Sequence, residues 1–187
     1  MVSKIQQRAE KIATFRFLEI YWMETLARWT PTTPELEVKV LFGRHLYDLA
    51  VHADALGKRT QELRAPLHLS LKPSEGYLEV MGQLASADGA AERIHSFYEV
   101  AVPGLETRYQ GYLDWTDKLL DEPSARIVQA ILGDYRRMKK ESKEVLQQLP
   151  HIKLTDAGKF AKVGQLESNF TEFVVHGALT PTAGGAS

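Results

Sequence analysis

The sequence contains no cysteine, and this absence excludes two kinds of structure. Without thiols the chain can form neither a disulfide framework nor a thiolate metal site, so a metal would need His, Glu, Asp or Tyr ligands. The chain also lacks any run of about 18 apolar residues, and its polar segment Met1–Glu10 lacks the apolar centre of a signal peptide. We therefore expect a cytoplasmic protein without a membrane partner.

An excess of one charge sign is also missing. The 23 Lys and Arg residues are balanced by 24 Asp and Glu residues, and the two signs are interspersed along the chain. Because nucleic-acid binding needs a basic surface, we expect no nucleic-acid partner. The sequence contains no P-loop, dinucleotide fingerprint or nucleophile elbow, so no nucleotide cofactor is expected.

Helical periodicity is the main signal that is present. Apolar residues recur at steps of three and four, and 187 residues with 44% hydrophobic content are enough to bury one core. We predict an all-α protein with long helices at residues 3–29, 34–63, 90–120 and 121–148 and a shorter helix at 74–85. Residues 1–150 would form a helical bundle and residues 151–187 a C-terminal extension, with a weak helical pattern at 157–175. The last ten or so residues should be disordered.

The connection between the first two long helices is short. The segment Thr30–Pro34 is predicted to end the first helix, and Thr33 to cap the start of the second. Helices joined in this way are antiparallel neighbours, so residues equidistant from about Thr32 should lie at similar heights. This rule predicts that Glu19 faces His45.

The same rule applies to the second pair of long helices. Across their connection Glu106 should lie near Tyr135 and Met138, and Tyr135 could donate a hydrogen bond to Glu106. Pro103 and Gly104 interrupt the third long helix, where we expect a kink.

Every long helix carries an ionisable or phenolic side chain within its apolar stripe. Buried polar groups cost free energy unless they are paired, so a converging set is typical of a site in a bundle core. The candidates are Glu19, His45, His52, Glu106 and Tyr135. We interpret them as acid–base catalysts, since desolvation should raise the pKa of Glu19. A structural role as mutual partners in the core stays open, and Asp48 either orients His45 or pairs with Arg44.

Two antiparallel helical hairpins joined by a crossover, with acids and histidines facing inward, resemble the ferritin-like superfamily of di-iron and di-manganese carboxylate proteins. The resemblance covers about Ile5 to Leu149. That family takes a Glu from each of two helices and a Glu-x-x-His from each of the other two. Glu19 and Glu106 would be the lone glutamates, and His52 the histidine of the second helix.

Three ligand positions depart from the family pattern. Leu49 stands three residues before His52, and Tyr135 and Met138 stand where the fourth helix should supply Glu and His. We therefore expect no intact di-iron centre and no metal cofactor. If iron or manganese were bound, the ligands would come from Glu19, His45, Asp48, His52 and Glu106. The one literal Glu-x-x-His, Glu92 to His95, lies about three turns from Glu106 and is a weak match.

Three functions are consistent with these residues. The leading hypothesis is a ferritin-like enzyme without its di-iron site, which performs acid–base chemistry on a small organic substrate in small-molecule biosynthesis. The alternatives are a non-haem iron or manganese oxygenase or oxidase, and a non-catalytic helical binding or assembly protein. A homodimer could form through Lys39, Leu46, Tyr47 and Ala50, and the segment after His151 could cover the pocket with Phe160, Val163, Leu166, Phe170 and Phe173.

Overall fold

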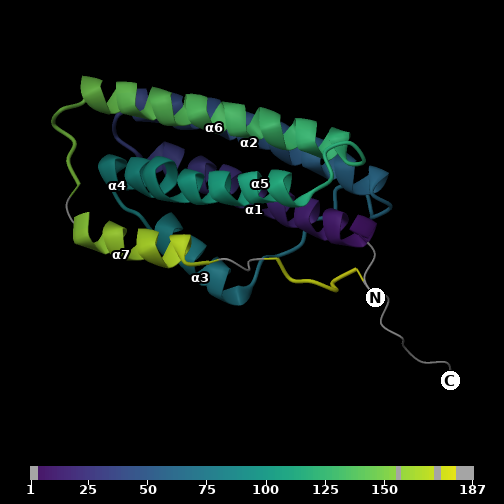
Figure 1. Ribbon diagram of the computed structural model, residues 1–187. Coiled ribbons are helices and arrows are strands. Elements are labelled where there is room, and N and C mark those ends of the chain that lie inside the picture. The colour runs from purple at the N-terminus through teal and green to yellow at the C-terminus, as the bar shows by residue number, and fades with distance from the viewer. Residues whose placement is uncertain (1–3, 155–156, 171–173, 180–187) are drawn as a thin grey trace.

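The computed structural model describes residues 4–154, 157–170 and 174–179 (Figure 1), and in this part of the chain the regular secondary structure is helical. The helices are α1 (Lys4–Thr32), α2 (Leu36–Glu62), α3 (Glu75–Ala85), α4 (Ala90–Ile94), the π-helix η1 (His95–Ala101), α5 (Val102–Trp115), α6 (Glu122–Gln148) and α7 (Ala157–Ser168). The predicted all-α class is confirmed. The expected disorder of the last ten or so residues falls mainly outside the described residues.

The connection between α1 and α2 is tighter than predicted. Helix α1 continues through Pro31 to Thr32, because threonine hydroxyls satisfy carbonyl groups of its last turns. The Oγ1 atoms of Thr30 and Thr33 donate to the carbonyl oxygens of Leu26 (2.7 Å) and Trp29 (2.8 Å). Thr33 therefore closes the end of α1 and does not cap α2, so that prediction was wrong.

The third long helix is a continuous helical segment built from α4, η1 and α5. The π-helix η1 ends just before Pro103, whose backbone nitrogen has no hydrogen to donate. The kink was expected at Pro103 and Gly104, but both residues lie within the α-helix α5, and the irregular stretch is the π-helix that precedes them. The segment stops at Trp115, earlier than predicted, because Thr116 is extended and Asp117 accepts the backbone N–H groups that follow it.

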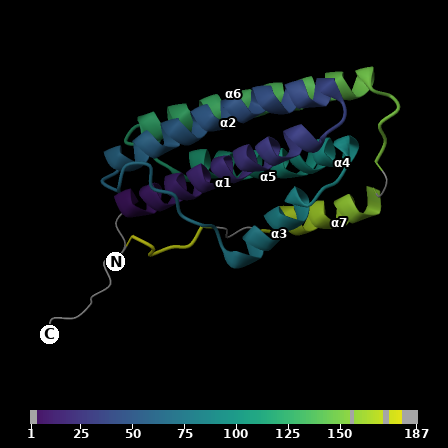
Figure 2. The ribbon, with the colours of Figure 1, turned by 180° about the vertical axis from the view of Figure 1, so that it is seen from behind.

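The long helices lie side by side in two views (Figures 1 and 2), with α2 in contact with α1 and α6, and α5 in contact with α6. After α2 the chain crosses back through a loop to α3, and the backbone N–H of Leu71 donates to the carbonyl of Ala13 on the way (3.2 Å). Helix α3 packs against η1 and α7. One apolar core joins all these elements, and its largest fully buried side chains include Trp22, Phe15, Phe42, Phe97 and Tyr77.

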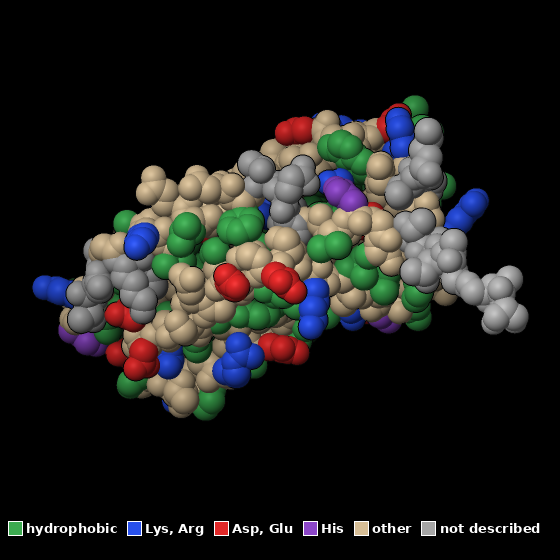
Figure 3. All heavy atoms as spheres, turned by 90° about the horizontal axis from the view of Figure 1, so that it is seen from below, with side chains coloured by type: hydrophobic (Ala, Val, Ile, Leu, Met, Phe, Trp, Pro, Cys, Tyr) green, Lys and Arg blue, Asp and Glu red, His purple; other side chains and the backbone are tan. Residues whose placement is uncertain are grey.

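The C-terminal extension contributes α7, which ends at Ser168 and not near residue 175. Acidic, basic and apolar side chains are mixed on the face that carries α3 and α7 (Figure 3). Val163 is buried there, whereas the side chains of Phe160 and Phe173 lie outside the described residues. No helix in the described ranges is long and apolar enough to cross a membrane.

Candidate functional site

The carboxylate of Glu19 is the centre of a buried polar cluster. Its side chain on α1 is 0% exposed. Oε1 accepts hydrogen bonds from the hydroxyl groups of Tyr109 on α5 and Tyr135 on α6 (2.5 Å to Tyr135). Oε2 lies 3.1 Å from Nδ1 of His52 on α2. Side chains from all four long helical segments therefore meet at one carboxylate.

His52 connects this carboxylate to the protein surface. Its Nε2 atom lies 3.1 Å from Oδ2 of Asp134, whose side chain is 38% exposed. Burial disfavours the charged imidazole, but the charge of Glu19 and the hydrogen bonds to both carboxylates outweigh it and raise the pKa of His52. Each ring nitrogen of His52 thus faces one carboxylate.

The two tyrosines hold their protons. Burial, reinforced by the nearby charge of Glu19, raises the pKa of Tyr109 and of Tyr135 far above the ordinary value for a phenol. Both are therefore neutral hydrogen-bond donors, and Glu19 is their common acceptor.

His45 belongs to a second group of residues. Its Nδ1 atom lies 2.7 Å from the hydroxyl of Tyr98, and its Nε2 atom lies 3.2 Å from Glu141. Burial lowers the pKa of His45 despite its contact with Glu141. His45 and His52 are both buried on one face of α2, as predicted, but the structure does not bring His45 to Glu19.

Arg137 joins the two histidine groups at the surface. Its guanidinium donates to Asp134 (2.7 Å) and to Asp48 (3.0 Å), and its other terminal nitrogen lies 3.4 Å from Glu141. Asp48 therefore pairs with Arg137, whereas the sequence suggested His45 or Arg44 as its partner.

Glu106 does not join the cluster. It forms an ion pair with Lys139 at the edge between α5 and α6, so the expected contact with Tyr135 was wrong. The position three residues further on, Tyr109, points to Glu19 instead. The sequence therefore predicted the position of the site along α5 to within about one turn, but it selected a residue on the wrong side of the helix.

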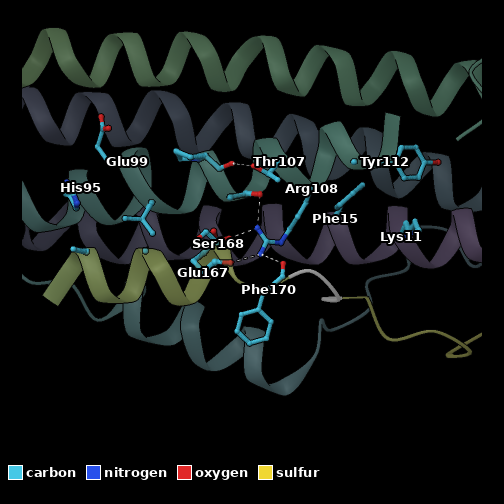
Figure 4. Close-up of a pocket in the computed structure, with 16 residues that line it drawn as sticks. Lys11, Phe15, His95, Glu99, Thr107, Arg108, Tyr112, Glu167, Ser168 and Phe170 are labelled. Atoms are coloured by element: carbon cyan, nitrogen blue, oxygen red, sulfur yellow. Dashed lines mark hydrogen bonds and ion pairs between the residues drawn. The ribbon is translucent and has the colours of Figure 1, made fainter. Parts of the chain in front are cut away.

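A cavity of about 860 Å³ lies beside this cluster, between α1, the η1–α5 segment and α7. Glu99 and His95 lie toward one end and Tyr112 and Lys11 toward the other (Figure 4). Phe15 lines the cavity, and its ring centroid is 4.2 Å from that of Tyr109. Phe15 is thus the wall between the cavity and the Glu19 cluster.

A buried ion pair at the same cavity was missed in the sequence. Nη1 of Arg108 lies 2.5 Å from Oε1 of Glu167 on α7, and the hydroxyl of Tyr77 donates to the same oxygen (3.0 Å). Burial raises the pKa of Glu167, although the charge of Arg108 opposes this. Arg108 adjoins the apolar stripe of its helix. Nothing in the sequence indicates that its partner lies 59 residues further along the chain.

Glu92 and His95 also have separate surroundings. Oε2 of Glu92 accepts the backbone N–H of Asp88 at the start of α4 (3.3 Å), and His95 lines the cavity. Among the described residues, no group of three or more His, Asp or Glu side chains could hold a metal ion.

Comparison with protein-family models, curated proteins and solved structures gave no match.

Proposed function

We propose that this protein is an enzyme that moves protons to and from a small organic molecule bound in the cavity next to Phe15. The observation that carries the proposal is the unbroken series of hydrogen bonds from Tyr109 through Glu19 and His52 to Asp134. One end of the series lies behind the cavity wall, and the other end reaches solvent. Such a series can move protons between a buried reaction site and water.

We also propose a ferritin-like ancestry in which the di-iron site has been lost. The two hairpins, the crossover with α3 and the central Glu19 support this descent. The donor groups do not fit a dinuclear centre, because such a centre needs several oxygen and nitrogen ligands aimed at the same ions. Here His52 lies between two carboxylates, and two phenols face Oε1 of Glu19. No step of the proposed reaction uses a metal.

The proton transfer balances within the cluster. Glu19 and His52 share one proton between Oε2 and Nδ1. When a carbon-bound proton of the substrate reaches the oxygen of Tyr109, Tyr109 passes its hydroxyl proton to Oε1 of Glu19. The shared proton then settles on Nδ1 of His52, and Nε2 releases its proton to Asp134. Contact between substrate and Tyr109 requires the ring of Phe15 to rotate.

Isomerisation, cyclisation, elimination and hydration all need proton transfers of this kind. Small-molecule biosynthesis is the setting we propose. Phe15, Val100 and Phe170 give the cavity an apolar wall that suits an organic substrate. Charged side chains at the same cavity, among them Lys11, Glu99 and Arg108, can bind polar groups of that substrate.

Exchange of substrate protons with heavy water tests the proposal directly. The protein is incubated in D₂O with a panel of small carbonyl compounds, and deuterium uptake at carbon is followed by mass spectrometry. We expect uptake that falls by about 10²-fold or more in Glu19→Gln and Tyr109→Phe. Glu106→Gln is the matched control and should exchange at the wild-type rate. Uptake that is equal in all four proteins, or absent from the whole panel, would count against an enzyme of this type.

A second candidate function is ligand binding without catalysis. It is favoured by one observation, the position of Phe15 between the cavity and Tyr109. In that case Glu19 and His52 only stabilise the core. A compound that shifts the melting temperature of wild type and Glu19→Gln equally, without deuterium uptake, would identify this function.

A further inference from the structure

The side of α2 that faces away from the core carries a row of large apolar side chains. Leu36, Val40, Tyr47 and Val51 are 69%, 53%, 68% and 48% exposed. The helical repeat places them opposite the buried stripe of the same helix. A row of this kind on a water-facing surface indicates contact with a partner.

We propose that two copies of this chain form a symmetric dimer through this face, with their α2 helices antiparallel. A two-fold axis between Val40 and Gly43 places Leu36 against Tyr47 of the second copy, and Val40 against Gly43 of the second copy. At the exposed Gly43 a Cβ atom would meet nothing within 4 Å, so the partner backbone can approach there. The row is therefore complementary to itself.

Charges beside the row select this occupant and this direction. Glu37 and Arg44 lie on the same flank of α2, seven residues apart, and both are exposed. Arg44 already donates to Glu141 of its own chain (2.6 Å). In the antiparallel dimer Glu37 of the second copy lies next to the same guanidinium, which gives two equivalent ion pairs between the copies. A parallel two-fold arrangement would place the two Glu37–Arg44 flanks on opposite sides of the interface, so these ion pairs could not form.

A hollow of about 390 Å³ next to the row can receive the aromatic ring. It lies between α2 and α6. Leu36, Val40 and Val145 provide apolar lining, and the charged side chains of Glu37, Arg44, Glu141 and Glu144 line the rest of it. The register places the phenol of Tyr47 from the second copy at this hollow. A tyrosine ring suits such a place, because its ring is apolar and its hydroxyl can bind a polar group.

Analytical ultracentrifugation of the full chain tests the dimer. We expect a dimer at micromolar concentration, and an increase in its Kd of about tenfold or more in Tyr47→Glu. Leu119→Glu is the matched control, because Leu119 is 86% exposed outside α2, and its Kd should stay at the wild-type value. Circular dichroism confirms that each variant keeps its helices. A monomeric wild type, or a dimer that Tyr47→Glu does not weaken, overturns the proposal.

A charge exchange tests the register independently. Glu37→Arg alone and Arg44→Glu alone should each weaken the dimer, since each homodimer brings like charges together. An equimolar mixture of the two variants restores both ion pairs and should form heterodimers close to wild-type affinity. Failure of the mixture to associate better than either variant alone would overturn the antiparallel arrangement.

Discussion

The Nδ1 atom of His52 and the Oε2 atom of Glu19 lie 3.1 Å apart across the α1–α2 hairpin. The opposite ring nitrogen of His52 faces Asp134, so one imidazole lies between two carboxylates. His45, two turns earlier on the same helix, faces a phenol on one side and a carboxylate on the other. Burial lowers the pKa of His45, whereas the two carboxylates outweigh burial and raise the pKa of His52. The pKa values of the two histidines should therefore lie on opposite sides of the usual value.

The first prediction concerns these two pKa values. In an NMR titration of the folded protein, His52 should change its charge above about pH 6.5 and His45 below it. His52→Asn and His45→Asn assign the two signals. Equal midpoints for both imidazoles, or the reverse order, would contradict the proposed role of Glu19 and Asp134.

The two histidines should contribute to the pH dependence of stability with opposite signs. Because its folded pKa is raised, the contribution of His52 to the free energy of unfolding is fully present below about pH 6.5 and is lost as the pH rises through the folded pKa. His45 has a lowered pKa, so its contribution is present above about pH 6.5 and is lost as the pH falls through the folded value. Urea unfolding at a series of pH values, with each histidine variant, separates the two.

The second prediction compares Glu19 and Glu106, which the sequence analysis places in the same site. Glu19→Gln should lower the free energy of unfolding by about 3–5 kcal/mol, because it leaves His52 and Asp134 without the central charge. Glu106→Gln should change it by less than about 1 kcal/mol, since the partner Lys139 remains partly exposed. Urea denaturation of both variants at one pH is the measurement. Similar losses in the two variants would mean that Glu106 also has a buried role.

The difference between these glutamates shows what could be predicted from the sequence. Apolar periodicity identified the long helices and placed Glu19, His52 and Tyr135 on buried faces. It could not fix the register of the first hairpin, because α1 continues through Pro31 and shifts the pairing by about two turns along α2. On α5 both Glu106 and Tyr109 adjoin the apolar stripe, and only tertiary packing decides which one faces Glu19.

Residues outside the apolar stripes could not be predicted. Asp134, Arg137 and Glu141 have the ordinary appearance of charges on a helix surface, and similar charges occur on every helix. They join the site because the Nε2 atoms of His45 and His52 face α6, where they meet Glu141 and Asp134. The pair of Arg108 and Glu167 depends on how the C-terminal segment returns to the core, which local periodicity does not encode.

The third prediction concerns Asp121, which is fully buried at the start of α6. Its carboxylate accepts hydrogen bonds from Arg59 (2.9 Å), Tyr112 (2.6 Å) and Ser124 (2.6 Å). Asp121→Ala leaves the buried Arg59 with only the exposed Glu62 as its charge partner (2.7 Å). It also removes the acceptor of Tyr112 and Ser124, and should cost about 3–5 kcal/mol in urea unfolding. Glu122→Gln, at an exposed ion pair, is the control and should cost less than about 0.5 kcal/mol.

Low pH should destabilise the protein through protonation of the same carboxylate, Asp121. Burial opposes its charge, but the hydrogen bonds to Ser124, Tyr112 and its other partners outweigh burial and lower the pKa of Asp121. Its contribution to stability is therefore present above about pH 3.9 and is lost as the pH falls through the folded value. In Asp121→Ala this part of the acid sensitivity should disappear, and an unchanged acid unfolding curve would contradict the assignment.

The fourth prediction uses two glycines on α5. At Gly104 an added Cβ would overlap the carboxylate of Glu167, whereas at Gly111 it would meet nothing within 4 Å. The carboxylate cannot move aside cheaply, because Arg108 and Tyr77 hold it in a buried place. Gly104→Ala should therefore loosen the contact between α5 and α7 and destabilise the protein by about 1–3 kcal/mol. Gly111→Ala should be neutral or stabilising by about 0.5–1 kcal/mol, since alanine favours a helix.

Hydrogen exchange resolved along the chain distinguishes a local effect from a global one. In Gly104→Ala the amides of α7 should exchange faster while those of α1 and α2 stay protected, because the lost contact joins α7 to α5 and does not belong to the α1–α2 hairpin. In Gly111→Ala the exchange of α7 should match the wild type. If both variants left α7 unchanged, the ion pair between Arg108 and Glu167 would not be what holds this helix over the cavity.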